Sequence, residues 1–282
     1  MRTAPLPPQF RQNIPAGKKF FNLLDALKEN HLHTVCEEAK CPNRTDCYGR
    51  GTLTFQILGD ICTRRCGFCA EKTGRPNPVD LLEPARVLNA VTHLNLSHVV
   101  LTAPARDDLK DGGASVFAET VRVLKENIPH LTVEVLVSDL NGDYNSIQVV
   151  LESPPDIFNH NIETVKRLTP RVRSRATYER SLDVLKFVAK SKAVKTKSGL
   201  MVGLGETREE IFKTLRDLRK SSVQFLTVGQ YLSPSDKHLP MERYYSVWEF
   251  DAVRSYAYSI GFEKVLSGSL VRSSYHADEY VP

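Results

Sequence analysis

The sequence predicts an α/β protein with a parallel sheet, a partial (β/α)6 barrel that carries an N-terminal and a C-terminal extension. Two observations support this fold class. Short runs rich in β-branched residues alternate six times with amphipathic helical stretches. This alternation fills residues 52–261 and leaves 1–51 and 262–282 outside it. Because strand order cannot be read from one sequence, an open doubly wound sheet fits the same alternation.

Each expected strand is a short apolar run, and an expected helix follows it. The helix at 207–220 has the clearest pattern, since Thr207 and Glu210 form a capping box and apolar residues from Ile211 to Leu218 share one face. In chain order the expected strands are 53–58, 98–102, 132–137, 157–160, 196–202 and 223–230. The expected helices are 82–94, 114–127, 144–151, 177–190, 207–220 and 248–260.

The composition is that of an ordinary globular protein, with 41% hydrophobic and 25% charged residues. Disordered and collagen-like chains are therefore excluded. No apolar run reaches the roughly 18 residues of a membrane span, and residues 1–20 lack the apolar core of a secretory signal. We expect a cytoplasmic protein that does not enter the membrane. A net charge of +5 is too small for a dedicated nucleic-acid-binding protein.

The positive charge is concentrated in one segment. Residues 166–197 hold eleven Lys or Arg residues against Glu179 and Asp183, whereas the rest of the chain is net acidic. Such a local excess favours a specific acidic partner over general polyanion binding. A solvated helix face that carries Lys186 and Lys190 explains the same pattern equally well.

Three cysteines follow the first expected strand directly, in the order C-x3-C-x2-C. They are Cys62, Cys66 and Cys69. In barrels of parallel strands the active site lies at the carboxyl ends of the strands, which is where this loop begins. Structural zinc normally takes four ligands. Three thiolates suit a [4Fe–4S] cluster with one iron left open, and Arg64 and Arg65 in the loop would offset its negative charge.

Three more cysteines precede them, at Cys36, Cys41 and Cys47. All six cysteines thus lie within 34 residues, which in an intracellular protein indicates metal binding rather than disulfides. Taken alone, the first triplet also fits a zinc site with His31 or His33 as its fourth ligand.

The C-x3-C-x2-C loop, with the aromatic Phe68 before its last cysteine, is typical of radical S-adenosylmethionine enzymes. Together with the preceding C-x4-C-x5-C triplet, it resembles the lipoyl synthase family. Further matching blocks run almost to the end of the chain, at 106–113, 158–164, 201–207, 230–234 and 272–277. The chain departs from the family pattern at 102–105, where Thr-Ala-Pro-Ala replaces Thr-Ser-Val-Asp, and at 173–175, where Arg-Ser-Arg replaces Arg-Pro-Gly.

The resemblance implies an enzyme that inserts two sulfur atoms, at C6 and C8, into an octanoyl chain held on a lysine of another protein. It implies two [4Fe–4S] clusters and S-adenosylmethionine as cofactors. Implied partners are the lipoyl domains of 2-oxoacid dehydrogenases, the glycine cleavage H protein, and an electron donor such as ferredoxin or flavodoxin. The competing functions are another radical sulfurtransferase, a cofactor maturase, and a non-catalytic zinc or iron–sulfur electron-transfer module.

The resemblance also implies roles for individual residues. Cys62, Cys66 and Cys69 would hold the radical cluster, whereas Cys36, Cys41 and Cys47 would hold an auxiliary cluster. Ser274, or less favourably Ser273, would be the fourth ligand of the auxiliary cluster, because an oxygen ligand can be shed more readily than a thiolate. The expected S-adenosylmethionine contacts are Phe68, Asn161, Glu163, Arg173, Gly203 and Gly205. An ordinary strand–helix turn explains the two glycines nearly as well, a surface helix start explains Asn161 and Glu163, and neighbouring cations compete with Arg173.

Overall fold

Eight strands form one sheet in the described part of the computed structural model, which covers residues 18–38 and 53–277 together with Phe10, Cys41, Asn43, Cys47 and Tyr48. The strand order is β1-β2-β5-β6-β7-β8-β9-β10, and every neighbouring pair is parallel except β1 with β2. The bounds are β1 His33–Thr34, β2 Leu53–Gln56, β5 His98–Thr102, β6 Thr132–Leu136, β7 Ile157–Asn159, β8 Lys195–Val202, β9 Phe225–Gln230 and β10 Lys264–Gly268.

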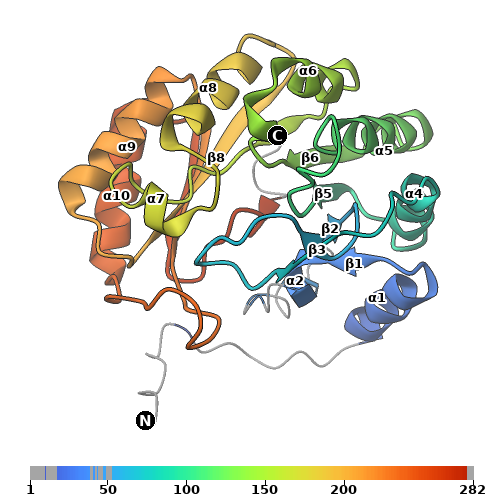
Figure 1. Cartoon of the computed structure of the whole chain (residues 1–282), viewed down its shortest axis with the longest axis horizontal. Coiled ribbons are helices and arrows are strands. Elements are labelled where there is room, and N and C mark those ends of the chain that lie inside the picture. Colours follow the sequence, from blue (N-terminus) through green and yellow to red (C-terminus); the bar gives the residue numbers. More distant parts are fainter. Residues whose placement is uncertain are drawn as a thin grey trace.

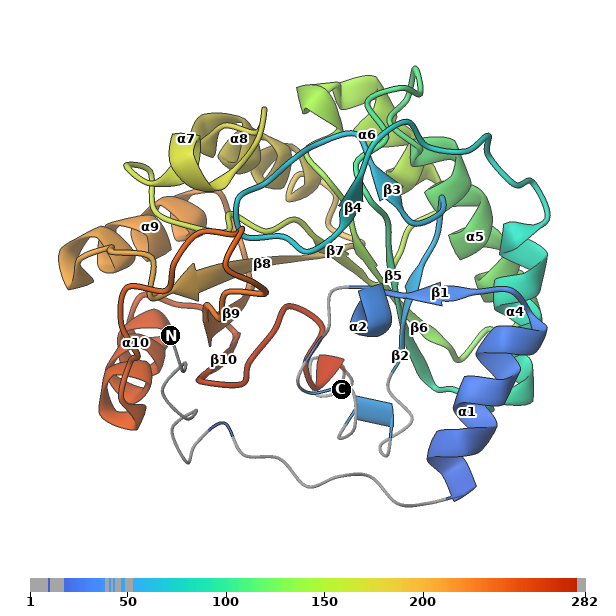
Figure 2. The ribbon, with the colours of Figure 1, turned by 60° about the horizontal axis from the view of Figure 1, so that its bottom comes forward.

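The strand order decides between the two predicted architectures. From β2 to β10 the strands follow one another without a reversal, whereas a doubly wound sheet changes direction at a switch point. The sheet curves but does not close, since β1 and β10 are its two edges (Figures 1 and 2). The partial barrel is therefore confirmed, and the doubly wound alternative is excluded.

Helices cover the outer face of the sheet (Figure 1). All six expected helices are confirmed to within two residues, and so is the capping box of Thr207 and Glu210. The helices are α1 Lys18–Glu29, α2 Val35–Glu38, α4 Glu83–His93, α5 Ala114–Asn127, α6 Tyr144–Glu152, α7 Thr169–Val172, α8 Tyr178–Val188, α9 Arg208–Lys220 and α10 Val247–Ser259. None of the described helices is long and apolar enough to span a membrane.

The seventh parallel strand, β10, was not predicted. It lies in the segment 262–282 that the sequence assigns to an extension, yet five of its residues pair with β9. The run Lys-Val-Leu-Ser-Gly has only two strongly apolar residues, so its pattern is weak without knowledge of its neighbour. Most of the predicted N-terminal extension, 1–51, lies outside the described residues, and there only β1, α1 and α2 are defined as elements.

Residues that are far apart in the sequence meet where the C-terminal segment passes the N-terminal part of the chain. After β10, the C-terminal segment runs back towards α2 (Figure 2). The side-chain amide of Asn43 donates a hydrogen bond to the carbonyl oxygen of Leu270, across 227 residues of sequence. The C-terminal segment therefore helps to enclose the interior of the barrel.

Charged side chains lie in the middle of the barrel. Lys197 of β8 and Glu134 of β6 are both fully buried, and their Nζ and Oε2 atoms are 2.9 Å apart. Asn159 of β7 donates to the other oxygen of Glu134 at 2.8 Å. Burial lowers the pKa of Lys197. A buried pair of this kind is stable only when both charges remain partnered. The pair and Asn159 therefore form a hydrogen-bonded polar group inside the barrel.

Candidate functional site

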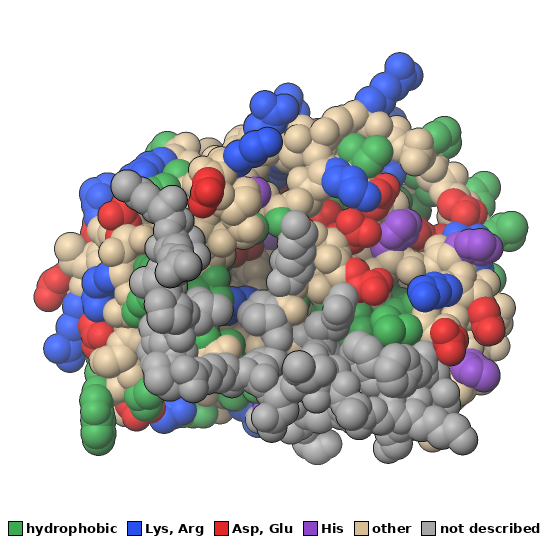
Figure 3. All heavy atoms as spheres, turned by 90° about the horizontal axis from the view of Figure 1, so that it is seen from below, with side chains coloured by type: hydrophobic (Ala, Val, Ile, Leu, Met, Phe, Trp, Pro, Cys, Tyr) green, Lys and Arg blue, Asp and Glu red, His purple; other side chains and the backbone are tan. Residues whose placement is uncertain are grey.

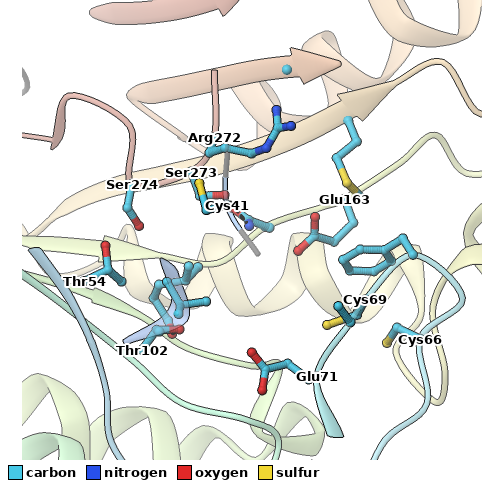
Figure 4. Close-up of a pocket in the computed structure, with 18 of the residues that line it drawn as sticks. Cys41, Thr54, Cys66, Cys69, Glu71, Thr102, Glu163, Arg272, Ser273 and Ser274 are labelled. Carbon is cyan, nitrogen blue, oxygen red and sulfur yellow. Dashed lines mark hydrogen bonds between the residues drawn. The ribbon is translucent and has the colours of Figure 1, made fainter. Parts of the chain in front are cut away.

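A cavity of about 580 Å³ opens at the carboxyl ends of the parallel strands. All six cysteines line it, as do Phe68, Asn161, Glu163, Arg173, Ser273 and Ser274. Figure 4 shows Cys41 and Ser274 on one side, near Thr54, and Cys66 and Cys69 on the other, with Glu71 and Glu163 between the two groups. The fold thus brings both predicted cysteine triplets and the predicted serine to one cavity.

Backbone hydrogen bonds hold the 62–69 loop in place. The amide of Gly67 donates to the carbonyl of Val172 at 2.9 Å, and the Gly67 carbonyl accepts from the amide of Leu239 at 2.9 Å. The Nε2 atom of His238 lies 3.0 Å from the carbonyl oxygen of Cys69. These hydrogen bonds therefore fix the loop between the end of α7 and the segment after β9.

Arg64 anchors the same loop, and this corrects its predicted role. Its side chain is 4% exposed and bonds Asp107 through Nε and Nη2, while Nη1 lies 2.6 Å from Asp139. Although burial opposes the charge, these two carboxylates hold the pKa of Arg64 above its usual range. The guanidinium is thus committed to two aspartates rather than to the thiols, and Arg65 is exposed.

Backbone N–H groups donate hydrogen bonds to two of the three thiols of the loop. The amide of Arg64 donates to Cys62 Sγ at 3.3 Å, and that of Ser174 donates to Cys66 Sγ at 3.4 Å. Burial raises the pKa of Cys66, and it raises that of Cys69 to about 12. Such thiols stay protonated on their own, but metal coordination removes the proton outright. The three thiols and their N–H donors therefore suit an iron–sulfur cluster.

The departure from the expected Arg-Pro-Gly pattern has a structural explanation. Ser174 supplies the amide that bonds Cys66, a donor that proline lacks. Arg175 has a φ of +64°, so the backbone there keeps the left-handed conformation in which glycine is favoured. At the other departure from the family pattern, residues 102–105, the side chains of Ala103, Pro104 and Ala105 line the cavity.

The first triplet lies across the cavity from the second. Cys36 and Cys47 are buried, Cys41 is partly buried, and none of the six cysteines is in a disulfide. In the described part of the chain, no three His, Cys, Asp or Glu side chains converge on the position of a single metal ion. Neither His31 nor His33 lines the cavity, and His33 Nδ1 instead lies 3.4 Å from Glu38. Neither histidine therefore lies on the cavity wall that the three cysteines share.

Four of the six predicted cofactor contacts line the cavity. Asn161 donates from Nδ2 to the hydroxyl of Ser273 at 2.6 Å, and its Oδ1 is buried without a partner among the described residues. Burial raises the pKa of the Glu163 carboxyl, with the charge of Arg173 opposing the shift. Phe68 and Arg173 complete this wall. The wall thus combines an acid, a cation and an amide, the set needed for a ligand with both charges and hydroxyl groups.

Gly203 and Gly205, the other two predicted contacts, do not line the cavity. A Cβ on Gly203 would lie 2.2 Å from Gln230 Nε2 and 2.8 Å from the carbonyl oxygen of Arg243. The glycine is needed because the loop after β9 crosses here, held by the hydrogen bond from Gln230 to Arg243. A Cβ on Gly205 would lie in ordinary van der Waals contact, 3.6 Å from Glu242 Cγ.

The cavity also contains polar residues that the sequence did not single out. Glu71 is the most notable, because its Oε1 is buried without a hydrogen-bond partner among the described residues and burial raises its pKa to about 7. The other polar lining residues are Thr54, Gln56, Thr102, Thr227 and Arg272. Thr54 and Gln56 could have been found from the sequence, because polar side chains at every second position of a strand indicate a polar interior.

The basic segment 166–197 is divided between the two ends of the barrel. Helix α8 begins after Ala176, which lines the cavity, and leads towards Lys195 at the start of β8. Lys186 and Lys190 therefore lie about 12 Å or more along the helix, towards the amino ends of the strands. The acidic partner expected for the segment 166–197 is therefore not favoured at these two lysines.

Two family models match the sequence. Residues 57–218 match the radical SAM superfamily, and residues 2–41 match the N-terminal domain of lipoyl synthase of the radical SAM family. The lipoyl synthase of Staphylococcus haemolyticus is 54% identical over 280 residues, which cover 98% of this chain and 90% of that protein. The lipoyl synthase of Staphylococcus aureus is 53% identical, with coverage of 98% and 91%.

Solved structures with the same fold are more distant in sequence. Streptococcus suis SuiB bound to its precursor peptide SuiA superposes with a TM-score of 0.59 at 11% identity, over 93% of this chain and 55% of that one. Methylornithine synthase superposes with a TM-score of 0.54 at 15% identity, over 91% and 83%. These likenesses support the fold.

The two glycines after β8 differ in what surrounds them, and their substitution should separate packing from backbone strain. Gly205→Ala introduces only a side chain at a φ of +97°, a cost of about 1–2 kcal/mol. Gly203→Ala adds the contact with the Arg243 backbone, so its loss of unfolding free energy should be clearly larger, about 3 kcal/mol or more. Urea unfolding of both variants measures this. Equal losses would mean that the loop does not pack against Gly203.

Proposed function

The chain belongs to the lipoyl synthase family of radical S-adenosylmethionine enzymes, and we propose that it inserts two sulfur atoms, at C6 and C8, into an octanoyl chain bound to a carrier lysine. It is a radical S-adenosylmethionine sulfurtransferase that acts on a protein-bound octanoyl group. The observation that carries the proposal is the single cavity that both cysteine triplets and Ser274 line.

Membership in the superfamily implies one [4Fe–4S] cluster and S-adenosylmethionine, and the second triplet supports a second cluster. When bound, these groups supply a 5′-deoxyadenosyl radical for hydrogen removal and sulfide for the new C–S bonds. Cys62, Cys66 and Cys69 would hold the radical cluster, and Cys36, Cys41 and Cys47 the auxiliary one. Analysis of reconstituted protein should then give about eight iron and eight sulfide per chain.

The charged wall of the cavity fits the zwitterionic end of S-adenosylmethionine. Glu163 accepts hydrogen bonds from an ammonium group, whereas the guanidinium of Arg173 suits a carboxylate. The unpartnered Oδ1 of Asn161 is an acceptor for a ribose hydroxyl. Phe68 adds an apolar surface beside the loop. The role of these residues is to orient the cofactor and to exclude water from the reactive carbon.

The hydrogen bonding of the C-terminal segment favours Ser274 over Ser273 as the fourth auxiliary ligand. The Ser273 hydroxyl is already bonded to Asn161 at 2.6 Å. Ser274 lines the cavity and has no hydrogen bond to the described residues, so its oxygen is available. An oxygen ligand binds iron less firmly than a thiolate, which suits a cluster that must lose sulfide.

The remaining cavity wall suits an alkyl chain. Leu136, Val137 and Met201 line the same cavity as the two triplets, and apolar walls with a few polar groups are typical of small-molecule sites. We propose lipoyl domains of 2-oxoacid dehydrogenases and the glycine cleavage H protein as the carriers. Ferredoxin or flavodoxin is the proposed electron donor.

The proposal is tested by mass spectrometry of an octanoylated carrier peptide. After anaerobic incubation with reconstituted enzyme, a reductant and S-adenosylmethionine, the octanoyl group should gain two sulfur atoms in place of two hydrogens. An unchanged peptide, despite formation of deoxyadenosine and intact clusters, would favour another radical sulfurtransferase. One or two zinc ions per chain in place of iron would contradict the whole scheme.

The two cysteine triplets should be separable by substitution. Replacing Cys62, Cys66 or Cys69 by Ala should abolish S-adenosylmethionine cleavage, because the electron source is lost. Replacing Cys36, Cys41 or Cys47 should preserve some cleavage but stop sulfur transfer. Deoxyadenosine and lipoyl product are measured in the same reaction. Lipoyl product from a first-triplet variant would show that its cluster is not the sulfur donor.

Ser274→Cys tests whether a weak oxygen ligand is required. A fourth thiolate should bind iron more tightly, so the variant should keep its iron and most deoxyadenosine formation while giving at least tenfold less lipoyl product. Ser274→Ala is the companion variant and should lose auxiliary iron instead. Sulfur insertion by Ser274→Cys at the wild-type rate would identify Ser274 as a bystander.

The placement of the basic residues predicts where an acidic carrier docks. Arg171 and Lys237 are exposed beside the loop of Cys62, Cys66 and Cys69 and have no ion-pair partner among the described residues. Their joint reversal to Glu should raise the KM for an octanoylated carrier protein about tenfold at low salt, but not the KM for a short octanoyl peptide.

Lys186 and Lys190 provide the matched control, since they carry the same charge at the other end of α8. Their reversal should leave both KM values unchanged. A larger effect at these lysines than at Arg171 and Lys237 would place the carrier on the outer helix face.

A further inference from the structure

Three side chains form a continuous hydrogen-bonded chain at the cavity wall, which His160 and Arg173 line and Ser181 does not. His160, just after β7, lies with Nδ1 2.8 Å from the carbonyl oxygen of Val137 and with Nε2 2.9 Å from the hydroxyl of Ser181. The same hydroxyl accepts a hydrogen bond from Nη1 of Arg173 at 2.6 Å. Ser181, in α8, is fully buried, and His160 is 1% exposed.

The direction of each hydrogen bond follows from the groups involved. A carbonyl oxygen only accepts, so the proton of neutral His160 is on Nδ1. Nε2 then has a lone pair and accepts from the Ser181 hydroxyl, whose oxygen in turn accepts from Arg173. Burial, with the charge of Arg173, lowers the pKa of His160 to about 4, so the imidazole is neutral at pH 7. The chain of donors and acceptors is therefore complete in one arrangement only.

Arg173 itself is a largely buried cation that lacks a close anion. It lines the cavity, and no carboxylate lies within 4.0 Å of it among the described residues, although Glu163 and Asp139 act on it from further away. Burial lowers the pKa of its guanidinium. A buried charge of this kind is unfavourable unless an anion completes the site. The arrangement thus points to a ligand that supplies a carboxylate.

We propose that Ser181 and His160 are positioning residues, which hold the guanidinium of Arg173 towards the cavity so that it receives the methionyl carboxylate of S-adenosylmethionine. This inference rests on the proposed function, because it takes the cofactor from it. Ser181 does not line the cavity, so its effect passes through Arg173. His160 fixes the direction of the Ser181 hydroxyl, which leaves its oxygen free to accept from the guanidinium.

The decisive experiment measures equilibrium binding of two ligands to the reconstituted protein under anaerobic conditions. One is S-adenosylmethionine, and the other is its decarboxylated analogue, which has the sulfonium and the amine but no carboxylate. Ser181→Ala should raise the Kd for S-adenosylmethionine about tenfold and that of the analogue less than twofold. Equal weakening of both ligands, or no change in either, would overturn the proposal.

Three further variants distinguish positioning from general damage to the fold. Ser181→Thr retains the hydroxyl and should keep S-adenosylmethionine binding within about threefold of wild type. Ser267→Ala removes another buried hydroxyl, one that donates to the Phe250 carbonyl at 2.9 Å, and should leave both Kd values unchanged. In an Arg173→Ala background, Ser181→Ala should have no further effect on binding, because the group it positions is absent. A full additional effect there would contradict the mechanism.

These binding measurements are independent of sulfur insertion. If the octanoyl peptide were not converted but the selective loss for S-adenosylmethionine were observed, the positioning role would stand and the proposed function would fail. If the peptide were converted but Ser181→Ala bound both ligands as wild type does, only the positioning role would fail.

Discussion

The guanidinium of Arg64 connects the cysteine loop to the carboxyl ends of two neighbouring strands. It bonds Asp107 in the segment after β5 and Asp139 in the segment after β6, and Arg175 and Arg180 bond these aspartates from the other side. Both aspartates keep a lowered pKa because Arg64 outweighs the effect of their burial. The positions of the three loop cysteines, and of the His238 and Ser174 contacts to them, depend on this anchor.

The sequence predicted where the cysteines of the site lie better than it predicted the contacts of the residues around them. Cysteine spacing and the strand that precedes it are local signals, so the placement of Cys62, Cys66 and Cys69 at the carboxyl end of β2 was predictable. The direction of Arg64 was not, because Asp107 is 43 residues away and nothing local identifies it as a counterion. Gly203 was expected to contact the cofactor, yet the loop that requires its missing side chain lies beyond the next strand and is not evident from its own motif.

The charged residues inside the barrel differ between its middle and the carboxyl ends of the strands. In the middle, Lys197 and Glu134 are fully buried and neutralise each other. At the carboxyl end, Arg173, Glu163 and Glu71 line the cavity and have no ion-pair partner within 4.0 Å among the described residues. Burial alone therefore does not identify functional charges here; it is burial without local neutralisation that marks them. Glu71 illustrates the limit of sequence reading, since a loop glutamate is unremarkable until its surroundings are known.

The contact between Asn43 and Leu270 has a consequence for the order of events during biosynthesis. Residues separated by 227 positions meet beside the cavity, so its wall is incomplete until almost the whole chain has left the ribosome. The parallel strands from β2 to β9 can pair earlier, since each joins its predecessor in sequence. Contacts of such long range form late because of the entropy of closing so large a loop. The loop of Cys62, Cys66 and Cys69 can thus fold while the wall beside Asn43 and Leu270 is still open.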